Sequence, residues 1–233
     1  MKLENAVVFV TGANRGLGRA FAEAARAAGA RKVYAAARDP ASVDLAGAVP
    51  VALDVTDAAQ VRAAAERAGD VTLLINNAGI LRPAGLLDGE ASIESARAEL
   101  ETNYFGPWRV AQAFAPALKA NGGGAIVNVL SVLSWLTVPG FAPYSASKAA
   151  AWQLSNGLRN ELQAQGTQVT SLHVGYMDTD MASGYDGEKS SPAEIARLTL
   201  AGVEAGQAEV LADAITQQVK QGLSAAKPPY AAA

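Results

Sequence analysis

Short apolar segments rich in β-branched residues alternate with longer alanine-rich segments, and this alternation limits the possible folds more than any other feature of the chain. The apolar segments have the length of strands that are buried on both faces, and the segments between them have helical periodicity. Strands that alternate with helices form a parallel sheet with right-handed crossovers. The pattern therefore predicts an α/β fold, a doubly wound Rossmann-type sheet of about seven parallel strands with helices on both faces.

The expected elements follow one another without a linker or an internal repeat. The predicted strands are 6–11, 32–36, 49–53, 71–75, 125–130, 168–173 and 209–211. The predicted helices are 17–28, 58–68, 93–120 with a bend at Pro107, 144–165, 192–205 and 214–223. We expect a single domain over residues 1–233, with a mobile lid at 180–191 and a tail at 228–233 that is loose or packed on a partner.

The composition argues against several classes of function. Nucleic-acid binding needs clustered Lys and Arg, whereas this chain has a net charge of −3 and a pI near 5.3. There are no cysteines and the only histidine is His173, so we expect no metal site. The longest apolar stretch is too short to span a bilayer, and residues 1–5 do not have the pattern of a signal peptide. We therefore expect a cytoplasmic protein that binds neither nucleic acid nor membrane.

A glycine-rich turn, Thr11-Gly-Ala-Asn-Arg-Gly-Leu-Gly18, connects the first predicted strand to the first predicted helix. Glycines at such a turn allow backbone N–H groups to approach a pyrophosphate at the N-terminus of the helix. The segment lacks the Gly-Lys-Ser/Thr ending of a P-loop, which argues against ATP or GTP. In this strand–turn–helix context the turn predicts a dinucleotide site.

Tyr144 and Lys148 are four residues apart in a segment of helical pattern, so both side chains leave the same face of the helix. A free tyrosine has a pKa near ~10, which is too high for proton transfer at neutral pH. A nearby ammonium group favours the phenolate, so we expect Lys148 to lower the pKa of Tyr144 and make it a general acid/base. The spacing is common by chance, and the other motifs give it its weight.

Together these motifs resemble those of the short-chain dehydrogenase/reductase family. The resemblance includes the glycine-rich turn, Asn76-Asn77-Ala78-Gly79, Asn103, Ser131, Tyr144 and Lys148, and it extends to about Thr179. It implies that Tyr144 exchanges a proton with the substrate oxygen and that Lys148 binds the nicotinamide ribose. It also implies that Ser131 donates to the substrate oxygen and that Asn103 holds a water that connects Lys148 to solvent. The hydride comes from the cofactor.

The resemblance also implies a cofactor-binding set. Its members are Gly12, Asn14, Arg15, Gly16, Leu17, Gly18, Arg38, Asp54, Val55, Asn77, Ala78, Gly79, Tyr144, Lys148, Gly175, Met177 and Thr179. NAD-dependent relatives tend to have an aspartate at the end of the second strand, where this chain has alanine. Arg38 and Arg15 offer guanidinium groups for a 2′-phosphate instead, so we expect NADP(H). Asp39 could still reach a ribose hydroxyl if the turn were shifted by two residues. The family usually has a proline before Gly175, and this chain has Val174.

Apolar and aromatic side chains are expected to surround the nicotinamide, namely Leu81, Leu133, Trp135, Phe141, Tyr176, Met181 and Tyr185. They favour a hydrophobic ketone or aldehyde, with or without an aromatic group, as the substrate. The predicted enzyme is then an NADP-dependent carbonyl reductase that interconverts this compound and its alcohol. A dinucleotide-sensing regulatory protein on the same fold is the alternative. Small-residue faces on the helices 103–120 and 144–165 favour a homodimer or a homotetramer, and the sequence does not distinguish them.

Overall fold

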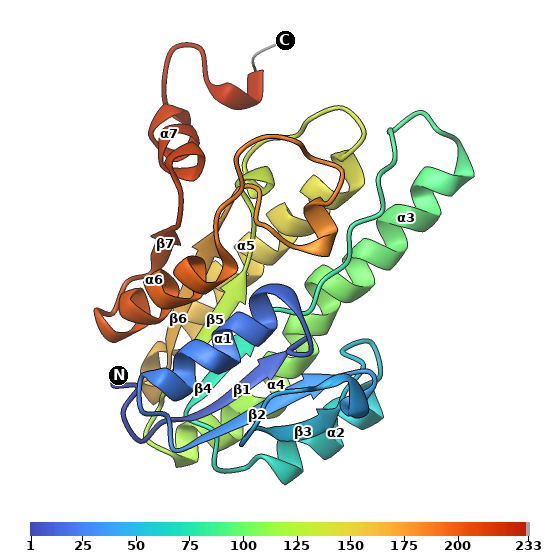
Figure 1. Cartoon of the computed structure of the whole chain (residues 1–233). Helices are drawn as coiled ribbons and strands as arrows, with labels where there is room; N and C mark the ends of the chain where they lie inside the picture. Colours follow the sequence, from blue (N-terminus) through green and yellow to red (C-terminus); the bar gives the residue numbers. More distant parts are fainter. Residues whose placement is uncertain (232–233) are drawn as a thin grey trace.

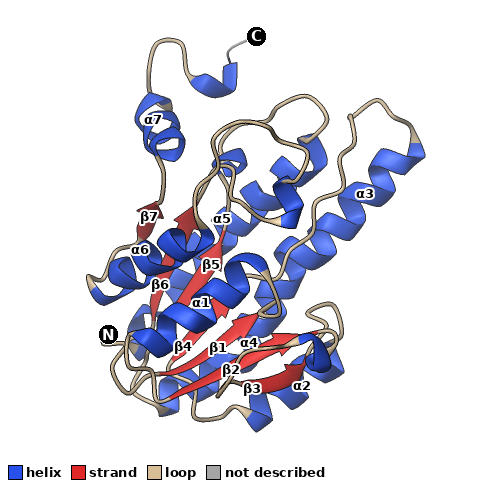
Figure 2. Ribbon diagram, in the orientation of Figure 1, coloured by secondary structure: helices blue, strands red, loops and turns tan. Residues whose placement is uncertain are grey.

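The computed structural model describes residues 1–231 and contains one seven-stranded sheet (Figure 2). The strands are β1 (Val7–Thr11), β2 (Lys32–Ala37), β3 (Val49–Ala52), β4 (Leu73–Asn76), β5 (Ala125–Val129), β6 (Gln168–His173) and β7 (Glu209–Leu211). Every neighbouring pair is parallel, and the strand order is β3-β2-β1-β4-β5-β6-β7. The chain thus builds the sheet outward from β1 and then reverses direction at β4. The predicted doubly wound fold is confirmed, and its topological switch point lies between β1 and β4.

Helices cover both faces of the sheet (Figure 1). They are α1 (Gly16–Ala27), α2 (Ala58–Arg67), α3 (Glu90–Leu100), α4 (Gly106–Ala120), α5 (Ala142–Leu162), α6 (Pro192–Glu204) and α7 (Ala214–Gly222). Side chains of α1 and α6 pack on one face of the sheet, and those of α2, α4 and α5 pack on the other. Successive residues of β1 enter opposite clusters, as Val8 and Phe9 do, which explains why the strands are apolar throughout.

The predicted helix 93–120 is two helices joined by a π-helical turn, Glu101–Phe105. We expected the break at Pro107, but this proline is the second residue of α4 and the break precedes it. Proline has no N–H, so it cannot bond to the carbonyl of Asn103 as a residue at this position of an α-helix normally does. The wider π turn, in which the Gly106 N–H donates to the carbonyl of Glu101, places Asn103 in the protein interior.

The segment after β6 is fixed at several points. A backbone bridge joins Met177 to Ser190, and the rings of Tyr176 and Tyr185 stack with their centroids 3.7 Å apart. A short 3₁₀ turn, Asp180–Ala182, begins the segment that we predicted as a lid. The mobility of this segment stays a prediction.

The last described segment, which follows α7, lies away from the sheet (Figure 1). The tail that we predicted at 228–233 contains a 3₁₀ turn, Pro229–Ala231, and residues 232–233 lie outside the described residues. Within residues 1–231, no helix combines the length and the apolar character that crossing a membrane requires.

Candidate active site

The glycine-rich turn between β1 and α1 has a backbone that other residues would adopt only with strain. Gly12 and Gly16 have φ values of +65° and +53°, in the left-handed region that glycine tolerates. Gly18 has an ordinary φ but no room, because a Cβ there would overlap the carbonyl group of Gly12 and lie 2.5 Å from the Asn77 amide nitrogen. The three glycines therefore have different roles, two in the bend and one in close packing of the turn against α1.

Asn77 connects the turn to the end of β4. Its side-chain amide donates to the carbonyl groups of Thr11 and Gly12, at 2.9 and 3.1 Å. In return, the Thr11 hydroxyl accepts from the backbone N–H groups of Asn77 and Ala78, both at 3.0 Å. These four hydrogen bonds join the carboxyl ends of the two strands at the switch point. The amide of Asn77 is thus engaged in holding the turn.

The N-terminus of α1 is open to a ligand. Arg15 precedes the helix and gives no side-chain hydrogen bond to its first N–H groups. Leu17 is buried in the core, so only its backbone can contribute to binding, while Asn14 is half-buried beside it. Thr179 lies over Gly16, where a Cβ would be 3.3 Å from the threonine Cγ2. The uncapped N–H groups, the bare glycine and the overlying segment fit the pyrophosphate of a dinucleotide.

The two arginines expected at the 2′-phosphate have different surroundings. Arg38 is exposed directly after β2. Arg15 forms an ion pair with Asp180, at 2.5 Å between Nη1 and Oδ2, in which both side chains are largely exposed. Asp39 caps the 3₁₀ turn 40–42 by accepting from the Ala41 N–H. The carboxylate that we kept as an alternative ribose partner is therefore already bonded within its own loop.

Asp54 and Val55 follow β3 on the adenine side of the predicted site. The Asp54 carboxylate accepts from both the N–H and the hydroxyl of Thr56, at 2.9 and 2.7 Å. Val55 is buried, and a Cβ on Gly106 would lie 2.8 Å from its Cγ2. Both side chains are fixed, which leaves the backbone of this loop and the second Asp54 oxygen as the groups available for an adenine ring.

Tyr144 and Lys148 lie in the first two turns of α5, and both are buried. The Lys148 ammonium donates to the carbonyl of Val129, at 2.9 Å, and lies 5.6 Å from the centroid of the Tyr144 ring. Val129 is the last residue of β5, so this bond connects the helix to the carboxyl end of the sheet. The predicted same-face arrangement of the two residues is present.

Ser131 begins a capped turn directly after β5. Its hydroxyl accepts from the Leu133 N–H, at 3.1 Å, and its own N–H donates to the hydroxyl of Ser134, at 3.3 Å. His173, at the end of β6, has its Nδ1 3.3 Å from the carbonyl of Ser131. Because these bonds fix the backbone of Ser131 on both sides, its hydroxyl has a defined position next to α5.

Asn103 holds the chain after β4 in place. Its side chain accepts from the Ile80 N–H and donates to the Ile80 carbonyl, both at 2.9 Å, and its second N–H donates to Ser147, at 3.0 Å. Both side-chain N–H groups are therefore used within the protein. The water that we expected Asn103 to hold stays a prediction. The backbone carbonyl of Asn103 would bind that water, because Pro107 has no N–H to donate to it.

The pKa of Tyr144 differs from the sequence-based expectation. We expected Lys148 to lower it, but burial raises it above its usual value and the negative charge of Glu99 adds to the effect. Burial also lowers the pKa of Lys148 to about 8, against the opposing influence of Glu99. The spacing of the two residues gives their proximity but not the loss of solvent around them, and desolvation dominates here. A phenol with a raised pKa stays protonated at neutral pH and can act as an acid.

Glu99 is the residue near the site that the sequence analysis missed. It is fully buried in α3, one turn before Asn103, and one carboxylate oxygen accepts from the Arg82 N–H at 2.7 Å. An acidic residue in a helical pattern usually faces solvent, which is why it drew no attention. Its spacing of four residues from Asn103, on the same helix face, was the available signal.

The residues expected around the substrate divide into two groups. Leu81, Leu133 and Phe141 are half-buried, and Tyr176, Met181 and Tyr185 are exposed on the segment after β6. Trp135 differs from both, because it is buried in a small core cluster with Val132 and Val219. Its ring stacks on His173 at 3.9 Å between centroids. The imidazole of His173 and the side chains of α7 pack against Trp135, which is as buried as Tyr144, so its place in the substrate pocket stays a prediction.

His173 belongs to a buried polar cluster behind Ser131. Its Nε2 lies 3.6 Å from an oxygen of Glu209, which also accepts from the indole of Trp152 at 3.0 Å. Lys220 donates to the second oxygen of Glu209 at 2.6 Å. The nearby imidazole of His173 and the hydrogen bonds from Lys220 and Trp152 lower the pKa of Glu209 to about 2, against the effect of burial. His173 is thus a packing residue, and its ring stacks on Trp135.

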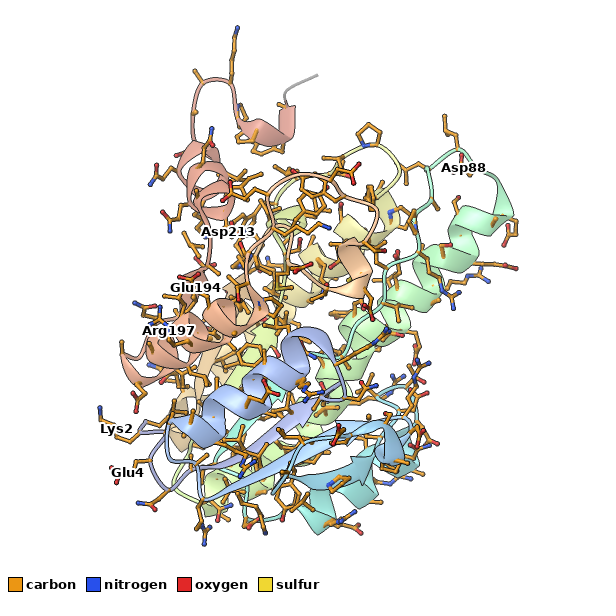
Figure 3. The ribbon with its side chains drawn as sticks, viewed as in Figure 1. Lys2, Glu4, Asp88, Glu194, Arg197 and Asp213 are labelled. Carbon is orange, nitrogen blue, oxygen red and sulfur yellow. The ribbon has the colours of Figure 1, made fainter. Side chains whose placement is uncertain are left out.

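The segment 174–179 is attached to the C-terminal helix. The Gly175 N–H donates to Asp213, at 2.6 Å, and Asp213 also caps the N-terminus of α7. Asp213 lies between α6 and α7 in Figure 3. A Cβ on Gly175 would lie 2.7 Å from the Ile215 side chain, so the glycine allows α7 to approach.

Within residues 1–231, no cluster of three or more potential metal ligands is present.

A sequence model of the family described as short chain dehydrogenase matches residues 6–189 of this chain. The chain belongs to the short-chain dehydrogenase/reductase family. The match begins before β1 and ends in the segment after β6, so it covers the glycine-rich turn and all four predicted catalytic residues. Family membership indicates that the chain is an oxidoreductase, and it does not identify the substrate.

Relatives and solved structures similar to this short-chain dehydrogenase match most of its length. It is 32% identical to the dehydrogenase/reductase SDR family member 7B of Xenopus tropicalis, over 90% of this chain and 77% of that protein. It is 37% identical to a galactitol 2-dehydrogenase (L-tagatose-forming) of Cereibacter sphaeroides, over 77% of this chain and 74% of that enzyme. Among solved structures, it is similar to a short-chain dehydrogenase from Burkholderia cenocepacia in complex with NADP. That match has a TM-score of 0.93 and 44% identity, and it covers 97% of this chain and 96% of the other.

Proposed function

We propose that this short-chain dehydrogenase is an NADP(H)-dependent oxidoreductase that interconverts a hydrophobic ketone or aldehyde and its alcohol. The main support is the burial of Asn103, Ser131, Tyr144 and Lys148 around the carboxyl end of β5. In an open parallel sheet, this edge beside the switch point is where ligands bind. A protein that only sensed a dinucleotide would not need this set of polar groups to be kept out of water.

The bound cofactor would supply the hydride. Tyr144, whose phenol burial keeps protonated, would donate its proton to the carbonyl oxygen during reduction, and in the reverse direction the phenolate that this step leaves would take the proton back from the alcohol. The hydroxyl of Ser131 accepts from Leu133, so its own hydrogen is free to bind the same oxygen. Lys148 uses one N–H on Val129 and can offer its others to the ribose hydroxyls.

The choice of NADP(H) rests on the loop after β2. Ala36 and Ala37 close the strand without a carboxylate, and Arg38 follows with an exposed guanidinium. The carboxylate of Asp39, the first acid of this loop, accepts from the Ala41 N–H and caps the 3₁₀ turn 40–42. Solved relatives support the choice, because the similar short-chain dehydrogenase and a gluconate 5-dehydrogenase, both from Burkholderia cenocepacia, were crystallised with NADP.

The substrate class rests on the apolar side chains of Leu81, Leu133, Phe141 and Tyr176 at the expected nicotinamide position. Relatives named for galactitol and for gluconate act on polyhydroxylated compounds, so these compounds form the competing class. An apolar pocket binds such substrates poorly, because burying a hydroxyl without a partner is unfavourable. We therefore expect a clear preference between the two classes.

The experiment is to follow the loss of reduced-cofactor absorbance with a panel of aromatic ketones, aldehydes, sugars and sugar acids. NADPH and NADH are compared on the wild type, on Tyr144→Phe and on Arg38→Ala. We expect turnover of the apolar carbonyls with NADPH, its loss in Tyr144→Phe, and a selective loss of NADPH affinity in Arg38→Ala. Turnover confined to sugars and sugar acids would refute the substrate class. Tight NADPH binding without turnover would favour the dinucleotide-sensing alternative.

Two further predictions accompany this function. The cytoplasmic location is supported by the acidic, cysteine-free composition. A homodimer or homotetramer is supported by a shallow groove between α4 and α5, which Trp108 and Leu158 line together with small and polar residues. Trp108 is 38% exposed there, and an exposed tryptophan is typical of protein–protein interfaces.

A further inference from the structure

Glu99 is a buried acid that the proposed mechanism does not use. None of its surface is exposed, although a carboxylate in the protein interior is unfavourable unless it is paired. Its Oε1 accepts from the Arg82 N–H at 2.7 Å. Its Oε2 is buried and has no hydrogen-bond partner among residues 1–231. One half of the carboxylate therefore lies in the interior with its charge uncompensated by any hydrogen bond in the described chain.

The position of Glu99 places this charge beside the proton-transfer residues. Glu99 and Asn103 are four residues apart, and the Asn103 amide bonds to Ser147 on α5. A Cβ on Gly79 would lie 3.2 Å from the Asn103 Oδ1 and 3.7 Å from the Lys148 Nζ. Asn103 and Lys148 thus meet at the same side of Gly79. Since α3 packs against α5, Glu99 and Lys148 lie on neighbouring helices.

The titratable groups that act on Glu99 come from two neighbouring segments. The loop after β4 contributes Arg82, through its N–H and its guanidinium, and α5 contributes Lys148 and Tyr144. Burial raises the pKa of Glu99, and Arg82 and Lys148 oppose that shift. In turn, the charge of Glu99 favours the proton on Lys148 and on Tyr144. All the groups except Arg82 are nearly free of solvent, so screening between them is weak.

We propose that Glu99 is a positioning residue whose buried carboxylate keeps Lys148 as an ammonium and Tyr144 as a phenol. It thereby sets the upper end of the pH range in which the enzyme binds NADPH and reduces a carbonyl. The inference rests on the proposed function for its catalytic part, but its effect on cofactor binding does not require turnover. No covalent step involves Glu99, which acts only through its charge.

Two variants remove the charge of Glu99, so the test does not fail if one of them does not fold. Glu99→Gln keeps an acceptor for the Arg82 N–H, and Glu99→Met replaces the carboxylate with an apolar side chain of similar size. Glu101→Gln is the matched control, because it makes the same change two residues later, where the carboxylate pairs with Arg109 near the surface. A purely structural role for Glu99 would alter the unfolding temperature of the variants and leave their pH profiles unchanged.

The first readout is the affinity for NADPH, measured by fluorescence titration over a series of pH values. The variant Lys148→Met identifies the part of the pH dependence of this affinity that Lys148 contributes. In wild type, affinity should fall as Lys148 loses its proton at alkaline pH. In both Glu99 variants we expect this fall to begin about one pH unit lower or more, since a nearby opposite charge shifts a pKa by about 1–3 units. The control should follow the wild type. A fall at the wild-type pH in folded Glu99 variants would overturn the proposal.

The second readout is the pH profile of kcat/KM for carbonyl reduction. Removal of the Glu99 charge lets Tyr144 lose its proton more easily, so the alkaline limb should move in the acid direction in both variants. An unmoved limb would again overturn the proposal. If the wild type binds NADPH but reduces no carbonyl, the proposed function fails by itself, and a shifted binding profile still supports the role of Glu99.

Discussion

Replacing Gly18 with alanine tests whether the turn after β1 binds the cofactor as its geometry indicates. The new Cβ would overlap the Gly12 carbonyl oxygen and lie 2.5 Å from the Asn77 amide nitrogen, whereas ordinary van der Waals contact begins at 3.4 Å. The turn and the side chain must therefore separate by about 1 Å. That movement breaks the bond from Asn77 to Gly12, which joins the turn to β4.

The magnitude follows from these two losses. Overpacking of this kind usually destabilises a protein by about 1–3 kcal/mol, which for a chain of this size lowers the unfolding temperature by roughly 2–12 °C. A displacement of about 1 Å in an active site costs on the order of 100-fold in the rate of reaction. We therefore expect Gly18→Ala to fold, to bind NADPH more weakly than the wild type, and to lose on the order of 100-fold in kcat/KM.

NADPH affinity is measured by fluorescence titration, and stability by thermal unfolding of the same preparation. Gly157→Ala is the control, since Gly157 lies exposed in α5 and no atom is within 4 Å of a Cβ placed there. Alanine in a helix interior is favoured over glycine by about 0.5–1 kcal/mol, so this variant should be slightly more stable and should bind NADPH normally. If Gly18→Ala bound NADPH within about threefold of wild type, the turn would not be the pyrophosphate site.

Three further predictions concern charge and assembly. Glu209 has its pKa lowered to about 2, so its stabilising effect is present above its ordinary pKa of 4.5 and is lost as the pH falls toward 2. Urea unfolding should show Glu209→Gln less stable than wild type at neutral pH, with the difference disappearing in acid. The pKa of Glu99 is raised, so its ionisation makes the wild type less stable as the pH rises above 4.5. The stability of Glu99→Gln relative to wild type should therefore improve over that range, and a pH-independent difference would contradict this. Trp108→Asp places a charge in the groove between α4 and α5 and should convert the oligomer to a monomer in sedimentation velocity, and a monomeric wild type would refute the interface.

The order of strands and helices could be predicted because each strand is buried on both faces and is therefore apolar throughout. The strand predicted at 71–75 shows the limit of that signal. The observed strand β4 ends on Asn76, whose amide bonds to Asn128 on β5 at 2.9 Å. A polar residue inside a strand depends on a partner 52 residues away, and the local pattern contains no information about that partner.

The candidate site shows the same division between local and distant information. Spacing alone predicted that Tyr144 and Lys148 share a helix face, because that is a property of one helix. The direction of the Tyr144 pKa depends on burial by other elements and on Glu99, and neither is visible along the sequence. The ion pair of Arg15 with Asp180 joins residues 165 positions apart. Distant packing also placed Trp135 inside the protein.

The π-helical turn at Glu101–Phe105 affects which surfaces of this protein can evolve independently. One extra residue in a helical turn rotates everything beyond it by about 100° around the axis. The turn therefore separates the orientation of α3, which carries Glu99 toward the catalytic residues, from that of α4, which packs on the sheet and presents Trp108 outward. Mutations that reshape the side of α3 that carries Glu99 need not disturb the side of α4 that carries Trp108. The two surfaces can evolve independently even though they share one nearly continuous helix.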